Sequence, residues 1–174
     1  MVDIDSGEVW NAISSTNFMV VGMVSAKGEA RTAGVMHFVD DGRLWFTTNE
    51  REWKARHIAA NPGVSVTVPI PKRIPFVPWV KVPAATITFT GVAETIPADQ
   101  LPAEAKHALL HGLEVTDGGE RGALIAVGVR PTADFVTYGV GVSILGMRDT
   151  ELARGRVAAE SAATAPAAAA PIAV

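Results

Sequence analysis

Short apolar stretches separated by turn residues recur along most of the chain, and their pattern predicts strands rather than long helices. Residues 85–96 alternate threonine with larger apolar side chains, which is typical of a strand with one buried and one polar face. Short turns between the stretches, such as Lys27-Gly28, favour an antiparallel barrel over a parallel α/β sheet. We expect about seven strands, at residues 17–26, 29–39, 44–48, 64–70, 85–96, 122–131 and 133–142.

Two helices are expected to flank these strands. The first covers residues 6–15 with Ser6 as its N-cap, and the second covers about 98–113. Both carry one apolar stripe, so each is expected to cover part of the sheet. The stripes consist of Val9, Trp10 and Ile13 in the first helix, and Leu101, Ala105, Leu109 and Leu113 in the second.

A third short helix is predicted between the strands at 44–48 and 64–70. Thr48 or Asn49 is its expected cap, and Glu52 stands at capping-box spacing from Asn49. A helix N-terminus exposes unpaired N–H groups and partial positive charge, so the hydroxyls of Thr47 and Thr48 and the cations Arg51 and Lys54 can jointly bind a phosphate there. The alternative is a solvent-exposed cationic face paired with nearby glutamates.

Two segments depart from the strand pattern. The proline-rich segment 69–83 is no central strand, and its apolar tip is expected to lie against a dimer partner or a substrate, with contact to a membrane surface as the lesser alternative. Residues 151–174 are expected to form an Ala/Pro-rich tail, disordered where the sequence is almost wholly alanine and proline, from about 158. Residues 1–150 are then the one folded domain.

The amino-acid composition excludes several classes of function. The chain has 174 residues, 48% hydrophobic content, a net charge of -3 and no cysteine. The absence of a basic surplus argues against a nucleic-acid partner, and the absence of cysteine removes disulfides and thiolate chemistry. No apolar run approaches the roughly 18 residues of a membrane span, and the N-terminal residues are acidic where a signal peptide is basic. We expect a cytoplasmic protein.

Candidates for side-chain catalysis are sparse. The serines lack a nearby His-Asp arrangement, and the acidic residues show no pairing that nominates a general acid and base. His107 and His111 stand at helical i,i+4 spacing, but without a carboxylate between them an exposed helix face is favoured over a metal site. We therefore expect no catalytic side chain and no metal, and a bound cofactor that supplies the chemistry.

The order of these elements resembles a known family. A hairpin, the block "DDGRLWFTTNEREWKARHIAANPGVSVTV" and then "ITFTGVAETI" are similar to the pyridoxamine 5'-phosphate oxidase-like split β-barrel superfamily, which includes flavin reductases and deazaflavin-dependent oxidoreductases. The resemblance covers roughly residues 8–140. It implies a mainly β fold with a few helices, arranged as a split antiparallel β-barrel, and a homodimer that binds FMN or a deazaflavin at the subunit interface.

The resemblance also implies a set of cofactor-binding positions. Lys54 matches the helical lysine that contacts the cofactor phosphate, and the segment 32–37 matches the strand that lines the flavin ring. The backbone of Gly34 to Met36 is expected to approach the ring because Gly34 has no side chain; the alternative is a plain core strand. The full set is Thr32, Gly34, Val35, Met36, His37, Thr47, Thr48, Arg51, Lys54 and Thr86.

The chain departs from the oxidase branch at several of these positions. Trp53 stands where that branch has an arginine, and Thr32 and His37 stand where it has arginine and lysine. These differences argue against true pyridoxamine-phosphate oxidase activity, because the cations for a phosphorylated substrate are missing.

Three hypotheses follow. The leading one is an FMN-dependent homodimeric oxidoreductase acting on a small planar redox substrate, without nucleic-acid or membrane partners. The second is a reductase that uses the deazaflavin coenzyme F-420, whose acidic tail would use Lys72, Arg73 and Lys81. The third is a non-catalytic flavin-binding or haem-binding protein, the haem version with His37 or His57 as axial ligand.

Overall fold

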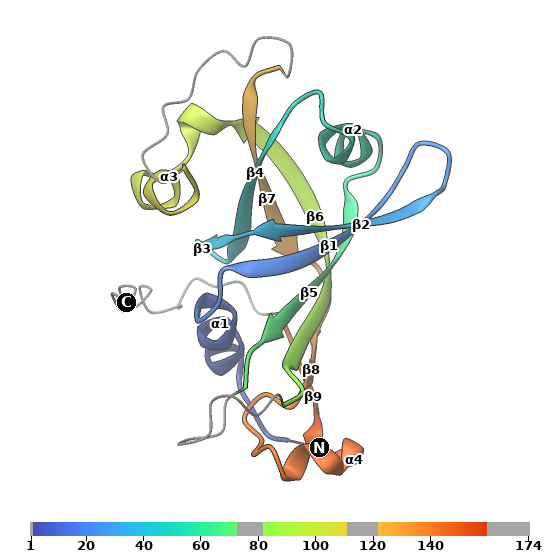
Figure 1. Cartoon of the computed structure of the whole chain (residues 1–174), viewed down its shortest axis with the longest axis vertical. Helices are drawn as coiled ribbons and strands as arrows, with labels where there is room; N and C mark the ends of the chain where they lie inside the picture. The colour runs from blue at the N-terminus through green and yellow to red at the C-terminus, as the bar shows by residue number, and fades with distance from the viewer. Residues whose placement is uncertain (1, 73–81, 111–121, 160–174) are drawn as a thin grey trace.

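The computed structural model describes residues 2–72, 82–110 and 122–159 of the chain. Its strands form one curled antiparallel sheet in the order β2-β1-β5-β6-β7-β4-β3, and β8 and β9 extend it from β6 (Figure 1). The expected mainly antiparallel fold is thereby confirmed. The strands are β1 (Phe18–Val24), β2 (Ala30–Met36), β3 (Phe38–Asp40), β4 (Arg43–Asn49), β5 (Gly63–Ile70), β6 (Ala85–Pro97), β7 (Leu124–Pro131), β8 (Phe135–Tyr138) and β9 (Arg154–Val157).

The helices are short and lie at the margins of the sheet. α1 and α2 lie on opposite sides of the β1–β2 pair in Figure 1, and α3 lies beside β3 and β4. They are α1 (Ser6–Ser14), α2 (Trp53–Ala60), α3 (Ala103–Leu110) and α4 (Thr150–Ala153), with 3-10 turns at Ala98–Gln100 and Gly146–Arg148. No helix in the described ranges is long and apolar enough to cross a membrane.

β6 organises the sheet because it is shared by three other strands. Along one edge it pairs with all of β5; along the other, β8 pairs with its residues 86–88 and β7 with its residues 91–97. The sheet therefore divides at β6, and β2 and β3 become the two ends of the main strand order. Only His37 separates β2 from β3 in the chain, so the two ends of the curled sheet are joined there.

The main core lies on the inner face of this curl. Alternate residues of β1, β4, β5, β6 and β7 contribute buried side chains to it, as the period of two predicts. Phe135 is at its centre, with the rings of Trp10 and Phe89 packed edge-on at 5.3 and 5.2 Å between centroids. Trp10 comes from α1, so this cluster fixes the N-terminal helix to the sheet. A smaller cluster between α3 and the outer face of β4 contains Trp45, Leu101, Ala105 and Ala126.

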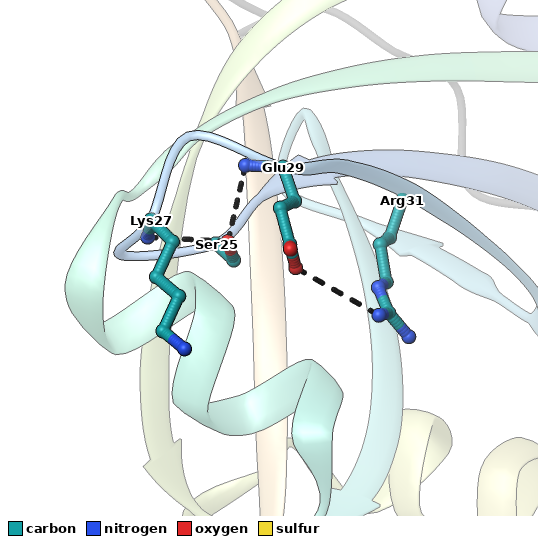
Figure 2. A network of polar contacts seen from close by, with 4 residues as sticks. All are labelled: Ser25, Lys27, Glu29 and Arg31. Carbon is teal, nitrogen blue, oxygen red and sulfur yellow. Dashed lines mark hydrogen bonds and ion pairs between the residues drawn. The ribbon is translucent and has the colours of Figure 1, made fainter.

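The hairpin between β1 and β2 differs from the expected two-residue turn. Ser25 and Glu29 still form a backbone pair, so the loop has three residues, and Gly28 has the left-handed φ of +82° that such loops require. Figure 2 shows that the Ser25 hydroxyl accepts hydrogen bonds from the N–H groups of Lys27 and Glu29, at 3.2 and 3.1 Å. The Glu29 carboxylate lies 3.8 Å from Arg31. The turn is thus held by its own side chains.

Helix boundaries also differ from the expected ones. α1 is capped by Asp5 instead of Ser6: the Asp5 carboxylate accepts from the Glu8 N–H at 2.8 Å, and Glu8 bonds back to the Asp5 N–H at 3.0 Å. The helix expected over 98–113 is divided into a 3-10 turn and α3, since Pro102 cannot continue a helix from the preceding turn. Leu113 and His111 lie outside the described residues.

The beginning of the predicted tail is ordered, up to the point near residue 158 from which disorder is predicted. Residues 151–174 were predicted to be tail, yet α4 and β9 occupy residues 150–157, and β9 pairs with β8 from Phe135 to Tyr138. Residues 160–174, and 73–81 of the proline-rich segment, lie outside the described part of the chain.

We predict that Gly91→Ala destabilises the protein by about 1–3 kcal/mol, because overpacked strands must separate. A Cβ at residue 91 would lie 2.6 Å from the Arg130 carbonyl oxygen across the β6–β7 pair. Gly63→Ala is the matched control, since its Cβ would meet only Asn61 Oδ1 at 3.4 Å, and its effect should stay within about 0.5 kcal/mol. Urea unfolding at constant m-value measures both; equal midpoints would contradict the prediction.

Candidate functional site

Among the described residues, no strand pairs with the outer edge of β2, which is here called the open edge. The His37 N–H donates to the Asn17 carbonyl at 2.8 Å, and the Ser25 N–H donates to Glu29 at 2.9 Å, in the same register as the rest of the β1–β2 pair. Because backbone groups alternate between the two edges of an antiparallel strand, the odd-numbered residues of β2 bond to β1. The N–H and C=O groups of Thr32, Gly34 and Met36 point the other way, and no described strand pairs with them.

The side chains of β2 divide in the same way. Thr32, Gly34 and Met36 lie on the exposed outer face, while Ala33 and Val35 pack against the main core. Of the predicted positions in this strand, Val35 packs its side chain against the core and bonds its backbone groups to β1, so neither faces the open edge. The other three present backbone groups at the open edge.

The space beside Gly34 is occupied by the chain itself. We expected the missing side chain to leave room for a planar ring, but a Cβ built on Gly34 would lie 2.8 Å from Cζ and 2.9 Å from Cε2 of Phe18. The ring of Phe18 therefore fills the position of a side chain at residue 34. A ligand ring at this strand meets Phe18 from the face of the sheet and meets the Gly34 backbone only from the open edge.

His37 faces the interior. It is 4% exposed, and its Nε2 lies 3.3 Å from the Ile13 carbonyl oxygen of α1, while its Nδ1 is buried without a partner among the described residues. Burial lowers the pKa of His37 to about 4, although the hydrogen bond to Ile13 acts in the opposite direction. His37 thus joins α1 to the β2–β3 corner and has no ring nitrogen turned toward the open edge.

The two threonines of β4 point to opposite faces of the sheet. Thr48 is 6% exposed and shares the inner face with Phe46, whereas Thr47 is half-buried and shares the outer face with Trp45. Their backbones pair with β7, at Ile125 and Ala126. The two hydroxyls therefore do not converge on one point, which the period of two along a strand dictates.

The start of α2 lacks the expected capping box. The helix begins at Trp53 with Glu52 as N-cap, and no side chain makes a capping hydrogen bond. The Glu52 N–H donates instead to the Asn49 carbonyl at 3.0 Å, so residues 49–52 form a turn that precedes the helix. Within the described residues, the Glu52 side chain does not cap the first N–H groups of α2, which keep their capacity to bind an anion.

Lys54 is held beside this uncapped turn. Its ammonium lies 3.8 Å from the Glu52 carboxylate and 5.4 Å from the centroid of the Trp53 ring, and the side chain is 20% exposed. These contacts position a cation at the helix start. Arg51 is exposed in the preceding turn and takes part in interactions of its own.

Sequence reasoning missed the residue that supports this turn. Gly122, with φ of +78°, packs so closely that a Cβ would lie 2.6 Å from Glu50 Cγ and 2.9 Å from Arg51 Cγ. The Glu50 N–H also donates to the Ala123 carbonyl at 2.9 Å. The only signal in the sequence is a glycine just before a strand, which is too common to single out.

Two further positions lie apart from the α2 start. Thr86 is half-buried on β6, with Pro69 and Tyr138 as its neighbours in register. Thr32 lines an open groove of about 620 Å³ on the outer face of β1, β2, β5 and β6, and none of the other predicted residues lines it. Among residues the structure describes, no three His, Asp or Glu side chains gather as a metal site.

Comparison with known proteins identifies the family. The sequence profile described as pyridoxamine 5'-phosphate oxidase matches residues 7–122, which is more than half of the chain. The chain belongs to the pyridoxamine 5'-phosphate oxidase family. No curated protein matches it as a relative.

Solved structures share the split-barrel fold of this oxidase family and differ in their ligands. A haem-binding protein from Mycobacterium smegmatis is 18% identical, with a TM-score of 0.64. The match covers 95% of this chain but only 62% of the length of that protein. An F420 reductase is 19% identical with a TM-score of 0.52, covering 78% and 98% of the two chains. An FAD-binding protein from Mesorhizobium loti is 16% identical with a TM-score of 0.55, covering 74% and 91%. The expected split β-barrel is thus confirmed.

The residues present fit an FMN-type group in part. The uncapped start of α2 with Lys54 suits a phosphate, and the open edge of β2 suits a planar ring with polar atoms at its rim. Trp53, where the oxidase branch has arginine, leaves the phosphate position with fewer cations.

We predict a loss of stability on acidification through His37. The unfolded state takes up a proton below the ordinary pKa of 6.5 while the native state resists it until about 4. The free energy of unfolding should therefore fall by about 2 kcal/mol between pH 7.5 and 5 through this group. Urea unfolding of the parent and of His37→Gln at both pH values isolates the effect, since other groups titrate in both proteins. An identical pH dependence would contradict it.

Proposed function

We propose that the protein is a homodimeric, flavin-dependent oxidoreductase that binds FMN between subunits and acts on a small planar redox substrate. The observation that carries this proposal is the uncapped first turn of α2 with the Lys54 ammonium held beside it. Family membership supports the same assignment.

FMN, when bound, would supply the hydride or electron chemistry. The chain's own residues would bind and orient it. Lys54 and the first N–H groups of α2 would hold the phosphate, and the N–H and C=O groups of Gly34 and Met36 would meet polar atoms of the ring at the open edge of β2. This division requires no catalytic side chain.

The homodimer is part of the proposal. Part of the outer face of the sheet would be covered by the second subunit, because large apolar side chains lie exposed on this face. Thr86 lies on this face, so in a dimer it would reach a cofactor held mainly by the other subunit.

The deazaflavin F-420 and haem are the competing ligands. Of the cations expected to bind the acidic tail of F-420, Lys72 donates to the Val142 carbonyl, and Arg73 and Lys81 lie outside the described residues. Haem binding has the M. smegmatis protein in its favour. Against it, His37 is directed to α1, and the Nε2 of His57 is buried. FMN therefore remains the leading assignment.

We predict that Lys54→Ala weakens FMN binding and leaves riboflavin binding unchanged. Riboflavin carries the same ring without the phosphate, and a charge-assisted phosphate contact contributes about 1.5–3 kcal/mol, or roughly tenfold or more in affinity. Fluorescence quenching titrations of the cofactor-free protein measure both constants.

Arg56→Ala is the matched control, because Arg56 is an exposed cation later in the same helix. It should bind FMN like the parent. The phosphate assignment fails if Lys54→Ala binds FMN as tightly as the parent does. Parallel titrations with F-420 and haem decide the branch: tight binding of either one, with none of FMN, would replace the proposed cofactor.

A further inference from the structure

Two large apolar side chains lie exposed together at the rim of the sheet. Phe18 is 43% and Met36 is 47% exposed, and the two residues stand directly opposite each other in the β1–β2 register. Both side chains lie on the outer face. Opposite residues of neighbouring strands are close enough for their side chains to pack together, so they form one apolar surface, here called the Phe18–Met36 platform.

The Phe18 ring extends from this platform across the backbone of Gly34. Gly34 is the diagonal neighbour of Phe18 across the strand pair, and only its missing side chain leaves room for the ring, whose Cζ lies 2.8 Å from an added Cβ. The backbone of Gly34 has no positive φ, so its conformation does not require glycine. The close approach of Phe18 is what requires it.

The platform adjoins the open edge of β2. Gly34 and Met36 direct their N–H and C=O groups outward along this edge, beside the apolar surface that Phe18 and Met36 make. A ligand that uses both features has an apolar planar face and hydrogen-bonding atoms along one rim. A tricyclic flavin-type ring has this chemistry; an aliphatic chain lacks the polar rim, and a sugar lacks the apolar face.

Resting on the function proposed above, we propose that the Phe18–Met36 platform binds the planar ring of the flavin-type cofactor, with Phe18 as the aromatic contact. Phe18 is not among the positions that the family resemblance implied. The platform separates ring recognition from phosphate recognition, which belongs to Lys54 and the start of α2.

The same face carries two control residues. Val92 and Val136 are 41% and 44% exposed, which matches the platform residues. Their strands, however, are paired on both sides at these positions: Val92 with Gly63 and Arg130, and Val136 with Thr88 and Arg156. They offer apolar surface without free backbone groups. Variants at these two positions therefore distinguish non-specific hydrophobic binding to the outer face from specific binding of the ring.

The experiment titrates FMN and riboflavin against Phe18→Ala, Gly34→Ala and the double variant, each verified as folded by circular dichroism. Loss of the aromatic contact should weaken both ligands by the same factor, roughly three- to tenfold. Gly34→Ala should act alike, because its Cβ displaces the Phe18 ring without backbone strain. In the Phe18→Ala background, Gly34→Ala should have no further effect. Val92→Ala and Val136→Ala should bind like the parent.

Each outcome decides the inference. It is overturned if Phe18→Ala and Gly34→Ala bind both flavins like the parent. If Lys54→Ala then still has a lower affinity for FMN and an unchanged affinity for riboflavin, the proposed function stands without the platform. It is also overturned if Gly34→Ala acts equally with and without Phe18. Light scattering measures the oligomeric state of each variant at the protein concentrations used for the titrations. If the variants bind flavin like the parent wherever they are dimeric, Phe18 acts as a subunit contact and the inference is overturned.

Discussion

The alternation of β6 is the constraint on which the other strands depend. Its inward residues Ala85, Ile87, Phe89 and Ala93 are all buried, so a slip of one position would move them to the outer face. With the register fixed, β5 takes one edge, and β8 and β7 share the other. Because two strands share one edge, the sheet divides instead of closing into a simple barrel.

The open edge of β2 follows from this division. β2 and β3 end the main strand order, and the chain joins them through His37, which α1 holds from inside. An unpaired edge normally invites aggregation. Here it is seven residues long and lies beside the Phe18–Met36 platform, and in the proposed function its backbone groups and the adjacent apolar surface would together contact the ring of the cofactor.

Most strands could be predicted from the sequence because each has a period of two or a continuous apolar run. β9 could not, since its residues "RGRV" carry a single large apolar side chain, and the strand is specified by pairing with β8. The capping box at Asn49 and Glu52 had the correct spacing but did not form. The contacts of Glu50 with Ala123 and Gly122 hold the turn 49–52, and such tertiary contacts leave no local pattern.

The candidate site shows the same limit. Residues 32–37 and the helix after β4 could be chosen as candidate cofactor contacts from residue types and the family resemblance, but the direction of each side chain could not be predicted. Side chains alternate between the two faces of a strand, so Thr47 and Thr48 lie on opposite faces, and Val35 and His37 face the interior. Gly34 is the clearest case: a glycine in a strand signals close approach of something, and only the structure identifies that neighbour as Phe18.

The balance of charge at α2 bears on the ligand. Glu52 holds the Lys54 ammonium in place, but its carboxylate also lies beside the position proposed for an anion and would repel it. With Trp53 in place of an arginine, Lys54 and the first N–H groups of α2 are the contacts proposed for the phosphate, and Glu52 offsets part of the lysine charge. Part of the binding energy must then come from the ring. An apolar contact such as the one proposed for Phe18 would complement the phosphate contact at Lys54, so neither end of the cofactor alone would account for its affinity.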